Sequence, residues 1–157
     1  GQFQKQWLGM MRRKLGLFTE EKEDEQLIAD LLQWMQRTGA DYTNSFRDLG
    51  EGQMPSNAIY QDHTFTAWHA RWQQRLNGNQ KPLEDALALM QRTNPAFIPR
   101  NHRVEAALKA AAEHANFSAF ETLLGVLSEP YRDNPQYRDF KNLPKPEERV
   151  YQTFCGT

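Results

Sequence analysis

Cysteine, long apolar runs and an excess of charge of either sign are all scarce in this sequence. Its 157 residues include one cysteine, Cys155, which excludes an internal disulfide and suits a reducing compartment such as the cytoplasm. The longest unbroken apolar run, from Ala86 to Met90, is far shorter than the roughly 18 residues of a membrane-spanning helix. We therefore expect a cytoplasmic chain with no membrane partner.

The charges are nearly balanced, with 19 Lys and Arg against 20 Asp and Glu and a formal net charge of −1. Because a domain that binds nucleic acid usually carries a basic surface, no nucleic-acid partner is expected. RNA binding through Arg12, Arg13, Lys14 and the tryptophans is the weaker alternative.

Prolines are also rare in the first half, since seven of the eight lie from Pro82 onward. Apolar residues recur at spacings of three and four through to about residue 127, which is typical of amphipathic helices. Glycines, Asn-Pro and capping signals divide this pattern into segments. The expected helices span residues 3–15, 20–38, 41–49, 65–77, 82–93, 103–115 and 118–127, with a loop at 50–62.

The last helix is expected to begin with a capping box at Ser118 and Glu121 and to turn Phe120, Leu123, Leu124 and Leu127 inward. Beyond it, four prolines break residues 130–157 into turns that still carry aromatic side chains. The sequence thus predicts an all-α fold, a compact bundle of about six or seven helices. Residues 1–129 form the helical domain, and residues 130–157 form a proline-rich extended tail wrapped on it.

No pattern of catalytic chemistry stands out. The four histidines include no pair at i, i+4 and have no nearby cysteine, which argues against a zinc site. The acidic clusters at 20–25 and 84–85 begin helices, where carboxylates complement the helix dipole. Trp68 and Trp72 fit a helical core better than a stacking platform for a base. We expect no catalytic, cofactor-binding or metal-binding residue in this chain.

One block differs in kind. Asn94-Pro95 ends a helix, Phe97 and Ile98 dock, and Arg100-Asn101 begins the next helix. We expect Arg100 to act as an internal clamp that donates to backbone carbonyls or a carboxylate.

This block, N-P-x-F-I-x-R-N, resembles the C-terminal region of the selenoprotein O family. The resemblance extends in the right order over nearly the whole chain. It includes Met11 to Leu17, Asp41-Tyr42-Thr43-Asn44 followed by Phe46-Arg47, Asn116-Phe117, Pro130-Tyr131 and a cysteine third from the end. The sequence departs from the family at Ser45, where a second aromatic is expected, and at Gly156-Thr157, where two serines are expected.

Members of this family are much longer, resemble protein kinases in fold, and transfer AMP from ATP to protein hydroxyls with a divalent metal. The resemblance implies that this chain is the helical C-terminal part of such an adenylyltransferase. ATP and Mg²⁺ or Mn²⁺ would bind in the preceding kinase-like part, so the fragment alone is expected to be inactive and to give structural support. Its partners would be that missing N-terminal part and, through the parent, protein substrates.

Three further points stay open. The alternative function is a free-standing helical domain that recognises another protein through an amphipathic face. Weak self-association is expected through Phe3, Trp7 and Met10 of the first helix. Cys155 is either an incidental thiol or, as the resemblance implies, a redox element that pairs with a cysteine of the kinase-like part.

Overall fold

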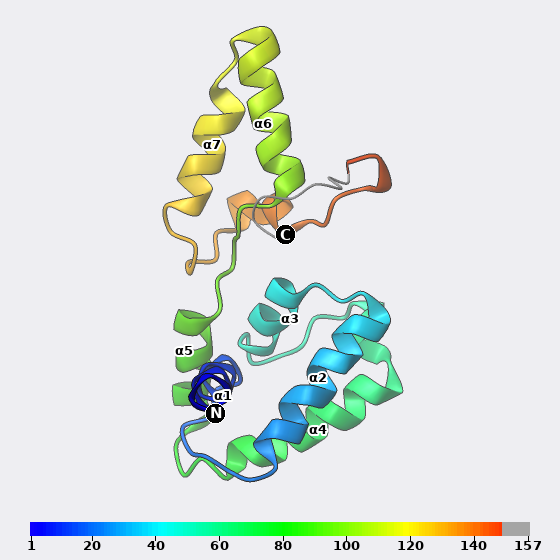
Figure 1. The fold of residues 1–157 in the computed structure, drawn as a ribbon, viewed down its shortest axis with the longest axis vertical. Coiled ribbons are helices and arrows are strands. Elements are labelled where there is room, and N and C mark those ends of the chain that lie inside the picture. Colours follow the sequence, from blue (N-terminus) through cyan, green and yellow to red (C-terminus); the bar gives the residue numbers. More distant parts are fainter. Residues whose placement is uncertain (149–157) are drawn as a thin grey trace. The chain divides into compact units, whose positions relative to one another are not determined.

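The computed structural model describes residues 1–148, and within that range the chain contains helices and no strand (Figure 1). The all-α prediction is confirmed, with seven α-helices among these residues. The α-helices are α1 (Gln2–Lys14), α2 (Asp24–Thr38), α3 (Tyr42–Leu49), α4 (His63–Asn77), α5 (Leu83–Thr93), α6 (Asn101–His114) and α7 (Ser118–Leu127). Short 3₁₀ helices occupy Ala58–Gln61, Pro135–Lys141 and Pro146–Glu148.

The chain divides into two compact units, of which the first is Gly1–Asn94 and the second begins at Pro95. This division falls at a different point from the expected boundary between residues 129 and 130. The physical reason lies in the second unit, where the Pro130 carbonyl accepts from the backbone N–H groups of Ala96 and Phe97 at 2.7 and 3.2 Å. The chain on both sides of residue 130 therefore belongs to the same unit.

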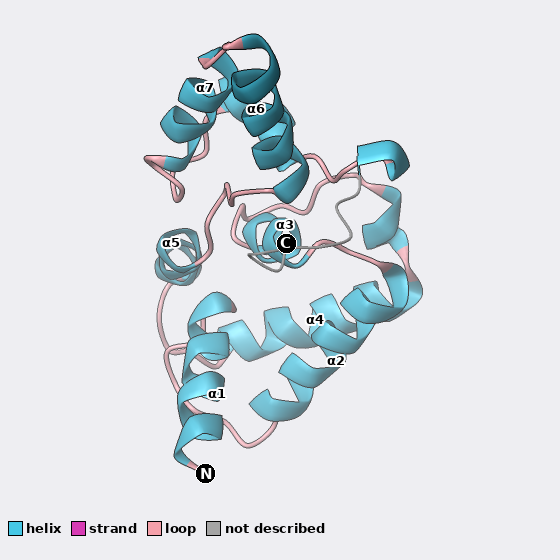
Figure 2. Cartoon of the chain, turned by 45° about the horizontal axis from the view of Figure 1, so that its top comes forward, coloured by secondary structure: helices cyan, strands magenta, loops and turns pink. Residues whose placement is uncertain are grey.

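The core of the first unit is rich in aromatic side chains from α2 and α4, which pack against each other (Figure 2). Trp68 and Trp72, four residues apart on α4, are each 3% exposed and stack with their rings at 8° to one another. Their indole N–H groups donate to the carbonyls of Leu27 and Leu15 at 2.8 and 2.9 Å. The core interpretation of these tryptophans is confirmed, because burial with a satisfied N–H leaves no face for a base.

Local signals in the sequence set several helix ends. Gly39 ends α2 with φ of 73°, a left-handed conformation that glycine adopts without steric cost. Asp41 caps α3, since its Oδ2 accepts from the backbone N–H of Asn44 at 2.8 Å. Residues 39–41 are therefore the whole connection between α2 and α3.

The second unit has an α6–α7 hairpin, visible in both ribbon views. Ala107 of α6 and Leu123 and Val126 of α7 are buried, and Val126 packs with Ala96 and Phe97. Leu124 is 56% exposed, so the prediction that it turns inward is wrong. It lies one position, or about 100° of helix, from the buried Leu123.

The predicted capping box at the start of α7 is also wrong. Ser118 is the first helical residue, and the N-cap is Phe117, which makes no side-chain cap. Asn116 explains the difference, because its Oδ1 accepts from both the backbone N–H and the hydroxyl of Ser118, at 3.1 and 2.7 Å. The Ser118 N–H contact is that of an Asx turn, and the Ser118 hydroxyl donates to the same Asn116 oxygen.

Residues that follow Pro130 pack within the second unit. Tyr137 and Phe140 pack against the buried cluster that contains Phe97, which is 2% exposed. The Phe97 and Tyr137 rings meet edge to face at 6.5 Å. Arg103 of α6 donates from Nη2 to the Asp139 carbonyl at 2.8 Å and lies over the Phe140 ring. The docking of Phe97 expected from the sequence is confirmed.

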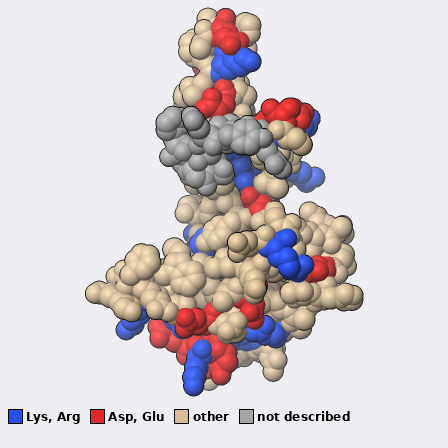
Figure 3. Space-filling model, turned by 45° about the vertical axis from the view of Figure 1, so that its right-hand side comes forward, with Lys and Arg blue, Asp and Glu red and all other residues tan. Residues whose placement is uncertain are grey.

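On the face drawn in Figure 3, acidic and basic side chains lie close together. Among residues 1–148, none of the helices combines the length and the apolar character needed to cross a membrane.

Candidate functional site

Three segments singled out in the sequence meet in the first unit, although up to 80 positions separate their contacting residues. They are the end of α1, the start of α3 and the end of α5. The meeting point is the Lys14 cluster, which comprises Lys14, Tyr42, Phe46 and Asn94. The local signals that predicted each helix gave no sign that these ends would converge.

The Lys14 ammonium lies half-buried between aromatic rings. Its Nζ is 5.3 Å from the ring centroids of both Tyr42 and Phe46, a cation–π geometry, and donates to Asn94 Oδ1 at 3.3 Å. Burial lowers the pKa of Lys14 below its usual value. The cluster therefore stabilises a partly desolvated cation with π faces and one amide oxygen.

Tyr42 packs against Phe46, and Asp41 caps α3, the helix that carries both rings. The Tyr42 ring meets Phe46 edge to face at 4.9 Å, and its hydroxyl lies 3.7 Å from the sulfur of Met11. Partial burial raises the pKa of the Tyr42 hydroxyl, so it stays protonated at neutral pH. Because Asp41 caps α3 by accepting from Asn44 N–H, the family-motif residues Asp41 and Tyr42 both serve local structure here.

Arg47 is the clamp that sequence reasoning missed. Its Nη1 donates to the carbonyls of Gln91 and Asn94, both at 3.0 Å, and its Nε lies 3.3 Å from a Glu51 oxygen. It thereby bonds carbonyls at the end of α5, where a helix leaves acceptors unpaired. The sequence assigned this type of role to Arg100, and the only signal for Arg47 was its place beside Phe46 in the family motif.

The second half of the N-P-x-F-I-x-R-N block lies in the second unit. Pro95 is half-buried and Phe97 is buried, as described above. Arg100 is 6% exposed, and its carbonyl accepts from the N–H groups of Arg103 and Val104 in the first turn of α6. Asn101 is the first residue of α6. The clamp role of Arg100 stays a prediction.

A buried ionic cluster was also missed, since the sequence attributed the acidic run at 20–25 to the helix dipole alone. Asp24 is 0% exposed, and its two oxygens accept from Arg12 Nε at 2.7 Å and Arg75 Nε at 2.6 Å. Burial alone would raise the pKa of Asp24, but hydrogen bonds from Arg75, Glu21 N–H and Arg12 outweigh it and lower the pKa. These residues form the Asp24 cluster, which joins α1, α2 and α4.

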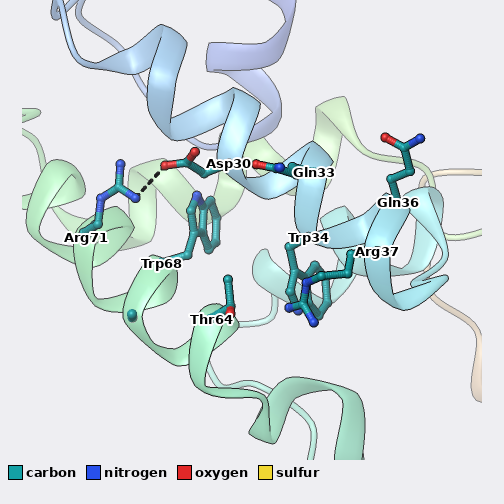
Figure 4. Close-up of a pocket in the computed structure, with 9 residues that line it drawn as sticks. Asp30, Gln33, Trp34, Gln36, Arg37, Thr64, Trp68 and Arg71 are labelled. Atoms are coloured by element: carbon teal, nitrogen blue, oxygen red, sulfur yellow. Dashed lines mark hydrogen bonds and ion pairs between the residues drawn. The ribbon is translucent and has the colours of Figure 1, made fainter.

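An open groove runs between α2 and α4, with a volume of about 620 Å³ (Figure 4). Arg71 pairs with Asp30 across the two helices at 2.7 Å, and Arg37 pairs with Asp62 at 2.8 Å. Trp34 lies along this groove but is only 1% exposed. Asp30, Arg37 and Arg71, the charged groups that line the groove, are therefore all in surface salt bridges.

His63 and His69 belong to α4 of the first unit, and His102 and His114 to α6 of the second; His102 is buried and His69 half-buried. Within residues 1–148, no group of three or more His, Cys, Asp or Glu is arranged to hold a metal ion. Cys155, the redox candidate, lies outside the described residues.

Comparison with known proteins gives consistent matches. A protein-family model described as "Protein adenylyltransferase SelO" matches residues 1–128. The chain is 61% identical over 155 residues to the protein nucleotidyltransferase YdiU of Nitrosococcus oceani, 52% to that of Syntrophotalea carbinolica and 49% to that of Alcanivorax borkumensis. Each alignment covers 99% of this chain but only 31%, 32% and 32% of the respective relative.

Proposed function

This chain belongs to the protein adenylyltransferase SelO family, and we propose that it is the helical C-terminal portion of a longer adenylyltransferase, called the parent below. The observation that carries this proposal is the coverage, since the relatives named protein nucleotidyltransferase match 99% of the chain over about a third of their own length. In the parent, AMP would pass from ATP to Ser, Thr or Tyr hydroxyls of proteins. The parent's fold would be kinase-like, as the family resemblance implies.

We place the nucleotide and metal sites, for ATP with Mg²⁺ or Mn²⁺, in the part of the parent that precedes this chain. The polar side chains of the family motifs support a structural role here. Asn94 bonds to Lys14, Arg47 bonds to α5 carbonyls, and Asp41 caps α3. Because these groups form hydrogen bonds within this chain, we propose that the chain supports the parent's catalytic part and does not contact ATP.

Transfer of labelled AMP tests the proposal. The full-length parent is expected to label a protein acceptor from labelled ATP and Mg²⁺ or Mn²⁺, whereas this chain alone is expected to label none. Circular dichroism of the isolated chain serves as the control that it is helical in the same buffer. Labelling by the chain alone would contradict the placement of the catalytic groups, and an inactive parent would contradict the proposed reaction.

Cys155 is proposed to act as a redox element of the parent, in a reducing compartment such as the cytoplasm. The support comes from the family resemblance. Because the chain has one cysteine, oxidation could join it only to a thiol outside this chain. The proposed partner is a cysteine of the preceding kinase-like part.

A further inference from the structure

A pocket of about 300 Å³ lies in the first unit between α4, α5 and the loop that follows α3. Its floor is apolar and well packed, since Leu49, Trp72 and Leu76 are 2%, 3% and 6% exposed. Its size is at the lower end of the range for pockets that take small molecules or anchoring side chains.

Apolar side chains at the rim of the pocket are exposed to solvent. Leu83, at the start of α5, is 57% exposed, and Met54 and Leu87 are half-buried. The loop that follows α3 approaches Leu87 of α5 at Gly52, where an added Cβ would lie 3.3 Å from Leu87 Cδ1. Gly52 has φ of 84°, a left-handed conformation that favours glycine. A glycine at this point therefore allows the loop to pack closely beside an exposed apolar edge.

The polar groups of the pocket are all uncharged at neutral pH. His69, Gln73 and Asn77 line it at four-residue intervals along α4, and Gln53 lines it from the loop. Burial lowers the pKa of His69 below its ordinary 6.5, so its imidazole is neutral at pH 7. None of the described residues that line this pocket is Asp, Glu, Lys or Arg, although these make up 25% of the sequence. The α2–α4 groove, by contrast, is lined by Asp30, Arg37 and Arg71.

We propose that this uncharged pocket receives a tyrosine or tryptophan side chain from the part of the parent polypeptide that lies outside this chain. An apolar floor with a neutral hydrogen-bonding rim matches a side chain with an apolar ring and a single polar tip. The lack of charge disfavours a Lys, Arg, Asp or Glu occupant, which would be desolvated there without a counter-charge. This inference rests on the proposed function, because about two thirds of each relative's length lies outside the aligned region.

A photo-crosslinker at the rim of the pocket tests the proposal in the full-length parent. With Leu83→p-benzoylphenylalanine, illumination is expected to join this position to a peptide outside residues 1–157 that contains Tyr or Trp. Adding Leu87→Trp, which fills the pocket, should abolish the crosslink. Leu87→Met is the matched control, because it nearly conserves volume and should retain the crosslink. Helical content by circular dichroism shows whether each variant folds.

Crosslinks that stay within residues 1–157, that join two copies, or that persist unchanged with Leu87→Trp would overturn the proposal. AMP transfer is measured on the unsubstituted parent beside these samples. Transfer without the predicted crosslink would overturn the pocket's role and leave the proposed function standing. The predicted crosslink without transfer would support the pocket's role and contradict the proposed reaction.

Discussion

Asn94 bonds to Lys14 at two places, the backbone and the tip of the side chain. Its Nδ2 donates to the Lys14 carbonyl oxygen at 2.9 Å, and its Oδ1 accepts from Lys14 Nζ at 3.3 Å. The two contacts fasten the residue after α5 to the last residue of α1. One carboxamide thus satisfies a carbonyl at a helix end and a half-buried ammonium.

Asn94→Ala should therefore lower the free energy of unfolding by about 1–3 kcal/mol, because it leaves buried polar groups without partners. Urea denaturation followed by circular dichroism measures this change. Asn57→Ala is the matched control, since Asn57 is exposed and makes no side-chain cap. Equal effects of the two substitutions would show that the Asn94 contacts add nothing to stability.

Arg47→Lys should destabilise the first unit by about 1–3 kcal/mol, although it keeps the charge. A lysine ammonium lacks the planar fork with which Arg47 donates to Gln91 and Asn94 carbonyls while its Nε lies near Glu51. Thermal unfolding monitored by tryptophan fluorescence gives the difference. Arg92→Lys, at an exposed position of α5, should leave the midpoint nearly unchanged. A wild-type midpoint for Arg47→Lys would contradict the clamp role.

Asp24 should make stability depend on acid pH. Its pKa in the folded chain is lowered from the ordinary 3.8, so at pH values between the two the unfolded chain binds more protons. The contribution of Asp24 is therefore complete above about 3.8 and is lost as the pH falls through the lower folded value. Asp24→Asn should flatten this acid limb of the curve of unfolding free energy against pH.

At neutral pH the same Asp24→Asn substitution should cost about 3–5 kcal/mol, because Arg12 and Arg75 lose their buried counter-charge. Asp85→Asn is the comparison, as Asp85 is exposed in the first turn of α5. If both variants kept the wild-type acid limb, Asp24 would not be the group that titrates.

Self-association through α1 is expected to be weak and to need Phe3. Phe3 is 83% exposed and Met10 is 36% exposed, while Trp7 is half-buried. Light scattering over a concentration series should show a rising mean mass for this chain and a constant monomer mass for Phe3→Ser. Leu108→Ser, in the exposed face of α6, should associate as the unsubstituted chain does. A constant monomer mass at high concentration for the unsubstituted chain would refute this prediction.

Oxidation of the parent should reveal the role of Cys155. Non-reducing electrophoresis of the parent and of Cys155→Ser is expected to show a faster-migrating oxidised form only when Cys155 is present. AMP transfer should change on reduction in the former and stay constant in the latter. If reductant altered both equally, Cys155 would be a bystander thiol.

The helices could be predicted from sequence because their signals are local. The apolar stripe Leu27, Ile28, Leu31, Leu32 and Met35 with Gly39 at its end defines α2 by spacing alone. Leu32 is half-buried, and the other four are buried. The start of α7 differs from the predicted capping box because Ser118 is already the first helical residue, and the Asn116 side-chain oxygen accepts from both its N–H and its hydroxyl. Capping strength depends on the exact backbone path, which spacing does not give.

The Lys14 and Asp24 clusters could not be predicted, because their contacts join residues far apart in the sequence. Asp24 meets Arg75 across 51 positions, and Lys14 meets Asn94 across 80. Nothing in the local pattern separates the buried Asp24 from its exposed neighbours Glu23 and Glu25. Only the packing of α1, α2 and α4 decides which carboxylate of that run is desolvated and paired.

If the chain is the supporting portion of an adenylyltransferase, the nucleotide site lies elsewhere in the parent. Calorimetric titration of ATP with Mg²⁺ into this chain and into the full-length parent, under the same conditions, tests this directly. The predicted result is binding to the parent and no heat of binding to the chain, which should be folded by circular dichroism. Micromolar binding of ATP by the chain alone would contradict the claim.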